Sequence, residues 1–234
     1  VSEMAKKLKF PIKCIGIPKT IDNDLPYTDC SPGFGSVAKY IATSTLEAGL
    51  DVKSMAETST KVFILEVMGR HAGWIAAASC LAASKAGDPP HIILLPEVPF
   101  QKGKFLAQVK QMIKEYGYCV IVASEGTQTI NGKFLADSGL TDAFGHKQLG
   151  GVAPILAGMI SKIGFKNHWA VADYLQRSAR HIASKTDLDQ AYAVGEHAVK
   201  LAISGKTAVM PIIKRISNSP YKWKIETAPL KNVA

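Results

Sequence analysis

The chain has 234 residues, of which 47% are hydrophobic and 20% charged, enough to bury the core of one large domain or two small ones. It contains no apolar run of about eighteen residues, the length that a membrane span needs, which argues against a membrane protein. Its formal charge of +9 is dispersed and forms no dense basic helix, which disfavours nucleic acid and favours a small phosphorylated ligand.

Nearly continuous apolar runs alternate with segments of helical period along the first half of the chain. The apolar runs predict strands buried on both faces, at residues 12–17, 61–67, 91–95 and 119–123. Helices are predicted between them, at residues 36–49, 71–86 and 104–116. This order predicts an α/β fold with a parallel sheet and flanking helices.

The second half of the chain alternates less regularly. Helices are predicted at residues 149–163 and 187–203, and strands at residues 169–174 and 209–213. The segment 125–148 is rich in Gly, Asp and Thr, so we expect it to separate two lobes, residues 1–140 and 141–234.

The first residues and the cysteines indicate the cellular compartment. The chain starts with Val1, and VSEMAKKLKF lacks the apolar stretch of a signal peptide, so the true N-terminus is expected to lie upstream. We expect a protein of the reducing cytoplasm without a zinc site, because the cysteines include no CxxC pair. These cysteines are Cys14, Cys30, Cys80 and Cys119.

Polar and charged residues follow the predicted strands of the first half. In such a sheet ligands bind beyond the carboxyl ends of the strands, so these residues are expected to converge on one site. They lie in segments 18–24, 68–70, 96–97 and 124–126.

The first of these segments combines a cation, a hydroxyl and two carboxylates: Lys19, Thr20, Asp22 and Asp24. Phosphoryl transfer needs charge neutralisation, positioning and removal of a proton, which these groups can supply. Either carboxylate suits a general base or a magnesium ligand. The alternative is an Asx-rich turn that caps the next helix.

Side chains in the other loops suit a sugar phosphate. Arg70 can bind a phosphate through two nitrogens beside the permissive Gly69, and Glu125 can bind sugar hydroxyls. For Arg70 and Glu125 the alternatives are an ordinary surface charge and a turn cap. A later basic loop suits a phosphate monoester or is merely solvated, and it contains Arg177, Arg180 and His181.

A competing motif lies at residues 33–38, where GFGSVA matches the G-x-G-x-x-A pattern of dinucleotide-binding loops. Asp51 follows at roughly the distance of a ribose-binding carboxylate. That pattern should follow a strand directly, whereas a polar loop intervenes here. A dinucleotide-dependent enzyme therefore stands as an alternative.

Five motifs resemble phosphofructokinases in order and approximate spacing: PKTIDND at 18–24, SPGFGSVAKYI at 31–41, EVMGRHAGWIA at 66–76, SEG at 124–126 and YLQRS at 174–178. The resemblance covers nearly the whole chain. It implies the phosphofructokinase-like fold and transfer of a phosphoryl group to the 1-hydroxyl of fructose 6-phosphate, with Mg²⁺ as cofactor. It also implies a cytoplasmic homo-oligomer without nucleic-acid or membrane partners.

The resemblance assigns roles by position. Asp22 would accept the hydroxyl proton, Asp24 would assist near the metal, and Lys19 would stabilise the leaving group. Arg70 would counter charge on the transferring group, and Glu125 would hold sugar hydroxyls. The other acceptor-site residues are expected to be Thr20, Ile21, Met68, Gly69, Leu175 and Gln176, with Tyr174 and Arg177 at the 6-phosphate. The first lobe would then carry the base and the acceptor loops, and the second the sugar-phosphate contacts.

The resemblance also suggests the donor. Lys19 favours pyrophosphate over ATP, because pyrophosphate-dependent members carry lysine there and many bacterial ATP-dependent members carry glycine. RSARHIASKTD at 177–187 differs from the RGGSP loop of short ATP enzymes and points the same way. The family's Gly-rich donor loop and Gly-Gly-Asp segment should precede Val1, so this chain is expected to be the acceptor half and weakly active alone. A non-catalytic sugar-phosphate-binding module is the remaining alternative.

Overall fold

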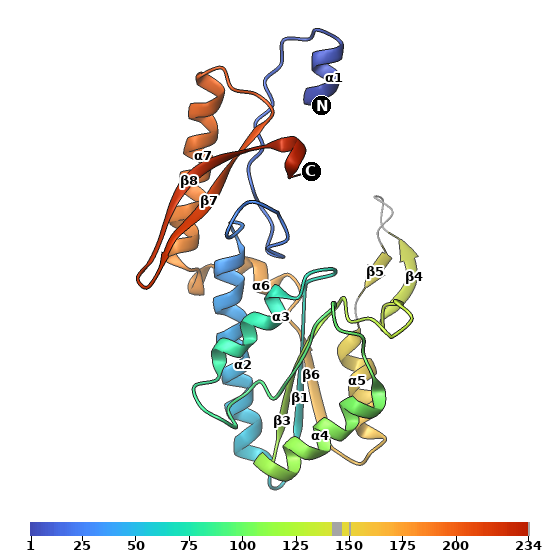
Figure 1. Cartoon of the computed structure of the whole chain (residues 1–234). Coiled ribbons are helices and arrows are strands. Elements are labelled where there is room, and N and C mark those ends of the chain that lie inside the picture. The colour runs from blue at the N-terminus through green and yellow to red at the C-terminus, as the bar shows by residue number, and fades with distance from the viewer. Residues whose placement is uncertain (142–146, 150, 234) are drawn as a thin grey trace. The chain divides into compact units, whose positions relative to one another are not determined.

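The computed structural model describes residues 1–141, 147–149 and 151–233, which form two compact units (Figure 1). Unit 1 combines Val1–Ser36 with Ala183–Ala234, and unit 2 is the continuous segment Val37–Ile182. This division differs from the expected boundary near residue 140, because the chain returns to the same sheet beyond that residue. Part of the expected linker, residues 142–146, lies outside the described residues.

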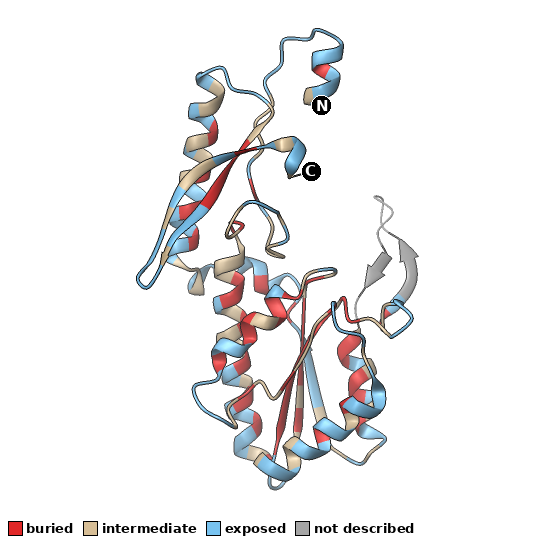
Figure 2. Ribbon diagram, in the orientation of Figure 1, coloured by how far each residue is buried: buried red, intermediate tan, exposed pale blue. Residues whose placement is uncertain are grey.

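Unit 2 is built on a parallel sheet of four strands in the order β2-β3-β1-β6. The strands are β1 (Val62–Val67), β2 (Ile92–Leu94), β3 (Cys119–Ser124) and β6 (Asn167–Val171). The strands predicted at 61–67, 91–95 and 119–123 are confirmed, and the one predicted at 169–174 lies slightly earlier. The central strands β1 and β3 are almost wholly buried, which explains their continuous apolar sequences (Figure 2).

Helices cover both faces of this sheet (Figure 1). Helices α4 (Lys102–Tyr116) and α5 (Val152–Ser161) pack on one face, where Phe105 and Leu156 join the main core. Helix α2 (Phe34–Met55) packs on the other face, where Val52 meets Val120. Helix α3 (Trp74–Ala78) contacts β2 and β3, and α6 (Leu175–Ser178) follows β6.

Unit 1 contains an antiparallel hairpin, β7 (Val209–Asn218) and β8 (Tyr221–Pro229), with α7 (Lys185–Ile203) packed against it. A short helix, α1 (Ser2–Lys7), lies near the N-terminus. The strand predicted at 12–17 is wrong, because among the described residues that segment makes one isolated bridge, between Ile15 and Val209, and joins no sheet. Residues 18–24 therefore do not follow a strand of the four-stranded sheet.

Three further elements differ from the sequence prediction. The helix predicted at 71–86 is shorter, because α3 continues only as a 3₁₀ turn over Ser79–Ala82. A turn follows, in which the Asp88 carboxylate accepts the amides of Ser84 and Lys85. Strand β8 was not predicted, because lysines and a glutamate alternate with its apolar residues. The hairpin of β4 (Asp137–Thr141) and β5 (Lys147–Leu149) also lies in a segment predicted as a loop. None of the helices in the described part of the chain is long and apolar enough to cross a membrane.

Candidate active site

Two turns meet at the carboxyl edge of the sheet in unit 2. The turn 68–70 follows β1 and the turn 124–126 follows its neighbour β3. Ser124 Oγ donates to the Gly69 carbonyl oxygen at 2.5 Å and accepts from the Gly126 amide at 3.1 Å. The Glu125 amide donates to the Val67 carbonyl oxygen at 2.9 Å. The neighbouring strand ends therefore hold Arg70 and Glu125 in one network.

This contact needs glycine on both sides. Gly69 has φ +126°, a backbone conformation that L side chains rarely adopt. A Cβ on Gly126 would collide with the Arg70 carbonyl oxygen and lie 2.7 Å from that of Gly69. The two turns can thus approach because Gly126 has no side chain, while Gly69 allows the backbone conformation of its own turn, where a Cβ would lie 2.6 Å from the Ala72 carbonyl oxygen.

We expect Gly126→Ala to lower the free energy of unfolding by about 1–3 kcal/mol or more, because backbone must move to admit the methyl group. Gly158→Ala is the matched control. Gly158 lies inside α5, and nothing lies within 4 Å of the added Cβ atom. This substitution should raise the free energy of unfolding by about 0.5–1 kcal/mol. Denaturant unfolding of both variants measures the effect. Equal stability of the two variants would contradict the close approach.

A cavity of about 160 Å³ lies at the same edge. It is lined by Glu66, Val67, Met68, Glu125, Val171, Asp173 and Gln176. Gln176 is buried, and it accepts from the Met68 amide at 3.3 Å and donates to the Asp173 carbonyl oxygen at 2.9 Å. The structure thus brings together Met68, Glu125 and Gln176, whereas Leu175 is 65% exposed and lies outside the lining.

Glu66 is a cavity residue that the sequence analysis did not identify. Its buried carboxylate accepts the amides of Gly151 at 3.1 Å and Ala153 at 2.8 Å, at the N-terminus of α5. Burial raises the pKa of the Glu66 carboxyl, although these amide hydrogen bonds oppose the rise. The only sequence signal was an acidic residue inside an apolar strand.

The raised pKa predicts a pH dependence that Glu66→Gln should remove. Folded protein takes up a proton on Glu66 at a higher pH than unfolded protein does, so stability falls as pH rises from 4.5 through the folded-state pKa. Relative to the variant, the unmodified protein should therefore gain stability as pH falls across this window, by up to about 1.4 kcal/mol per pH unit. Denaturant unfolding at several pH values measures the difference, and parallel curves would contradict it.

Three more predicted site residues lie in unit 2. The Nε atom of Arg70 is buried without a hydrogen-bond partner among the described residues. The Arg177 guanidinium lies 4.2 Å from the centre of the Tyr174 ring, a cation–π contact on an exposed surface. The exposed Arg177 guanidinium thus keeps donors open to an anion, whereas the Nε atom of Arg70 is shielded from solvent.

The remaining predicted residues lie in unit 1, in a loop that begins with Lys19 and Thr20. Thr20 Oγ1 accepts from the Asp22 amide at 3.0 Å, and Asn23 Oδ1 accepts from the Ser31 amide at 2.8 Å. Ile21 belongs to the same loop. Lys19 and Asp24 are exposed. The loop is thus held by Thr20 and Asn23, while Asp187 closes the N-terminus of the next helix, α2, which the Asx-rich alternative had expected this loop to cap. A loop held in this way is compatible with a catalytic carboxylate.

The G-x-G-x-x-A motif is a helix cap in this structure. The Asp187 carboxylate accepts the amides of Gly33 at 2.8 Å and Ser36 at 3.1 Å, at the N-terminus of α2. The diphosphate group of a bound dinucleotide would need these same amides. Because Asp187 already occupies them, the geometry argues against the dinucleotide alternative. The role of Asp187 was not predicted from the sequence. Ser184, three residues earlier, is the N-cap signal that marks the start of its helix.

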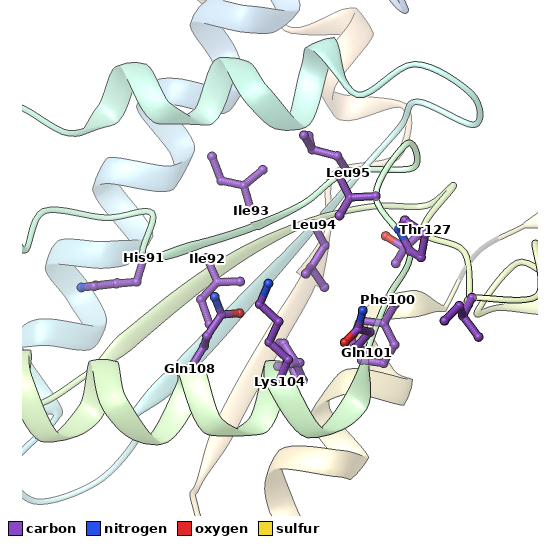
Figure 3. A pocket seen from close by; sticks show the side chains of 14 residues that line it. His91, Ile92, Ile93, Leu94, Leu95, Phe100, Gln101, Lys104, Gln108 and Thr127 are labelled. Carbon is purple, nitrogen blue, oxygen red and sulfur yellow. The ribbon is translucent and has the colours of Figure 1, made fainter.

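A larger hollow of about 400 Å³ lies beside the edge strand β2 and helix α4 (Figure 3). Its lining is mostly apolar, with Lys104 and Gln108 projecting from α4. No predicted site residue lines it. Size alone therefore does not identify the functional site in unit 2.

The part of the chain that the structure describes does not complete a metal site. Within residues 1–141, 147–149 and 151–233, no group of three or more His, Cys, Asp or Glu side chains is placed to hold a metal ion. Asp24 offers one exposed carboxylate. The described residues by themselves therefore do not fit a magnesium ion.

Known proteins resemble the chain in sequence and structure. The family model described as phosphofructokinase matches residues 1–202. The pyrophosphate–fructose 6-phosphate 1-phosphotransferases of Halomonas elongata and Xanthomonas campestris are 66% and 60% identical over the whole chain, which spans 56% of each relative. The crystal structure of pyrophosphate-dependent phosphofructokinase from Marinobacter aquaeolei is 60% identical, with a TM-score of 0.88 over the whole chain and 55% of that structure.

Proposed function

Because this chain belongs to the phosphofructokinase family, we propose that the whole protein transfers a phosphoryl group from pyrophosphate to fructose 6-phosphate, giving fructose 1,6-bisphosphate. The names of its similar relatives support this substrate pair. The chain spans about 56% of their length, so it supplies part of the proposed enzyme. A cytoplasmic location and a homo-oligomeric assembly belong to the same proposal.

The observation that carries the proposal is the network at the carboxyl edge of the unit 2 sheet. It holds Arg70, with its buried Nε lacking a partner among the described residues, beside a turn that presents Glu125. A guanidinium and a carboxylate are the groups that bind the phosphoryl oxygens and hydroxyls of a sugar phosphate. Met68 and Gly69 would line this acceptor site, with Tyr174 and Arg177 at the 6-phosphate.

The side-chain amide of Gln176 is proposed to position a turn rather than to bind the substrate directly. Both ends of its amide are already engaged, with the Met68 amide and the Asp173 carbonyl oxygen. We therefore propose that Gln176 holds the turn 68–70 in place. Leu175, exposed and outside the cavity lining, would act only as a neighbour of Tyr174.

Asp22 is proposed as the general base, flanked by Thr20 and Ile21. It would take the proton of the 1-hydroxyl as that oxygen bonds to a phosphorus of pyrophosphate. The bond from this phosphorus to the bridging oxygen breaks, and orthophosphate leaves with its charge countered by Lys19. Arg70 would neutralise charge on the transferring group.

Magnesium is part of the proposal only as chemistry that a pyrophosphate donor commonly requires. Asp24 is the one carboxylate of this chain proposed to contribute. The described residues alone do not make a metal site, so no step is assigned to the ion.

The whole protein, assayed with fructose 6-phosphate and either donor, tests this function. Fructose 1,6-bisphosphate should form from pyrophosphate with magnesium, and more slowly or not at all from ATP. Calorimetric titration with fructose 6-phosphate should show saturable binding. Binding without product from either donor would indicate a sugar-phosphate-binding module, and neither binding nor product would refute the proposal.

A further inference from the structure

We propose that Asp187 is a positioning residue for the Asp22 carboxyl group, an inference that rests on the proposed function. Asp187 belongs to α7, far from Asp22 in sequence, and only 4% of its surface is exposed. Both residues belong to unit 1. A continuous path of contacts joins them.

The first part of the path is a carboxylate that closes the N-terminus of α2. Asp187 Oδ1 accepts from the Gly33 amide at 2.8 Å. Its Oδ2 accepts from the Ser36 amide at 3.1 Å and from Ser36 Oγ at 2.5 Å. Helix N-termini carry free amides and a partial positive charge, so a carboxylate is the favoured partner there. Both oxygens of Asp187 are thus committed to this segment.

The second part runs from Gly33 to the loop that carries Asp22. Gly33 forms a parallel bridge with Thr20. Ile21 Cγ2 lies 3.3 Å from the point where a Cβ on Gly33 would stand, which is a tight contact, and Gly33 has φ +110°, a conformation that L side chains rarely adopt. Thr20 Oγ1 accepts the Asp22 amide at 3.0 Å. Asp187 therefore reaches Asp22 through a glycine and a threonine.

Asp187 is itself held firmly. Its amide donates to Ser184 Oγ at 3.4 Å, and the Ser184 amide donates to Ser36 Oγ at 3.2 Å. A Cβ on Gly35 would lie 3.1 Å from the Asp187 Cβ, which shows how closely the two segments approach. The start of α7 and the start of α2 thus form one hydrogen-bonded block.

The consequence for catalysis is a change in kcat rather than in substrate affinity. Asp187 acts on the loop through Gly33 and Thr20, and it contributes no donor or acceptor to the proposed sugar-phosphate contacts in unit 2. Misplacement of a reacting group by about 1 Å can slow a reaction by roughly a hundredfold, even when the altered residue is remote. Weakening the hydrogen bonds of Asp187 to Gly33 and Ser36 should therefore misalign the Asp22 carboxylate.

Asp187→Asn in the whole protein tests the inference, because the amide nitrogen that replaces Oδ2 cannot accept from Ser36. We expect kcat to fall about tenfold, with KM for fructose 6-phosphate changed by less than about twofold. Amides within residues 20–33 should exchange hydrogen faster than in the unmodified protein. The control is Asp189→Asn, which removes an exposed carboxylate of α7 that pairs with Lys185 at 2.7 Å and should leave all three values unchanged.

An unchanged kcat in folded Asp187→Asn protein would overturn the inference. So would a fall in kcat matched by an equal rise in KM, because that indicates general disruption. If the Asp187→Asn protein does not fold, Ser36→Ala takes its place, because it removes only the hydroxyl that donates to Asp187. We then expect kcat to fall about threefold. An unchanged kcat in this second variant would overturn the inference. Absence of transferase activity in the unmodified protein would instead refute the proposed function, while hydrogen exchange would still report whether Asp187 holds the loop.

Discussion

Replacing Asp22 with asparagine is expected to lower kcat about 10²- to 10⁴-fold while leaving fructose 6-phosphate binding near its original strength. Asparagine has nearly the same shape as aspartate but cannot take up the hydroxyl proton. The backbone contact should persist, because Thr20 Oγ1 accepts from the Asp22 amide rather than from its side chain. Steady-state kinetics and calorimetry on the whole protein measure the two quantities.

Asp51→Asn is the matched control for this experiment. Asp51 is exposed on α2 and is assigned no contact with the substrate. Its replacement should leave kcat unchanged and also tests the dinucleotide alternative, in which Asp51 would bind a ribose. Turnover of the Asp22 variant close to the unmodified value would remove Asp22 from the catalytic role.

Replacing Arg177 with alanine is expected to raise KM for fructose 6-phosphate about 10- to 100-fold, with a smaller change in kcat. The substitution removes charge-assisted hydrogen bonds to the 6-phosphate, each worth about 1.5–3 kcal/mol. The guanidinium lies 4.2 Å from the centre of the Tyr174 ring, a contact that favours this orientation of the side chain. Kinetics at saturating pyrophosphate measure the change in KM.

Two further variants make this result specific. Arg177→Lys keeps the positive charge but loses the planar pair of donors, so its KM should lie between those of the alanine variant and the unmodified protein. Tyr174→Phe keeps the ring beneath Arg177 but removes the hydroxyl proposed to lie at the 6-phosphate, so its KM should rise by less than that of the Arg177→Ala variant. An Arg177→Ala variant with unchanged KM would place the 6-phosphate elsewhere, and Arg180 would be the next residue to replace.

Most of the sheet in unit 2 was predictable from the sequence. Strands β1 and β3 are buried between helices and the edge strand β2 is partly buried, and such burial favours apolar residues at nearly every position. Segment 12–17 has the same apolar character but makes a single bridge, because its partner Val209 belongs to a hairpin from the other end of the chain. Apolar character does not reveal which strand a segment will pair with.

The site was only partly predictable. The turns that contain Arg70 and Glu125 follow adjacent strands of one sheet, so their convergence could be foreseen from the carboxyl-end rule. Asp22 was expected at the same edge for the same reason, but its loop belongs to unit 1. Glu66 was not predicted as a site residue, because a single carboxylate in an apolar strand does not indicate which helix amides will donate to it.

The sequence by itself determined the family and the strand-end turns, because short motifs such as PKTIDND and EVMGRHAGWIA and continuous apolar runs are local properties. The tertiary structure alone decided that Asp187 caps α2, that Gly126 must lack a side chain and that Glu66 binds the start of α5. Each of these contacts joins residues distant in the chain. Such contacts depend on the packing of whole elements, and no local pattern of residue types encodes that packing.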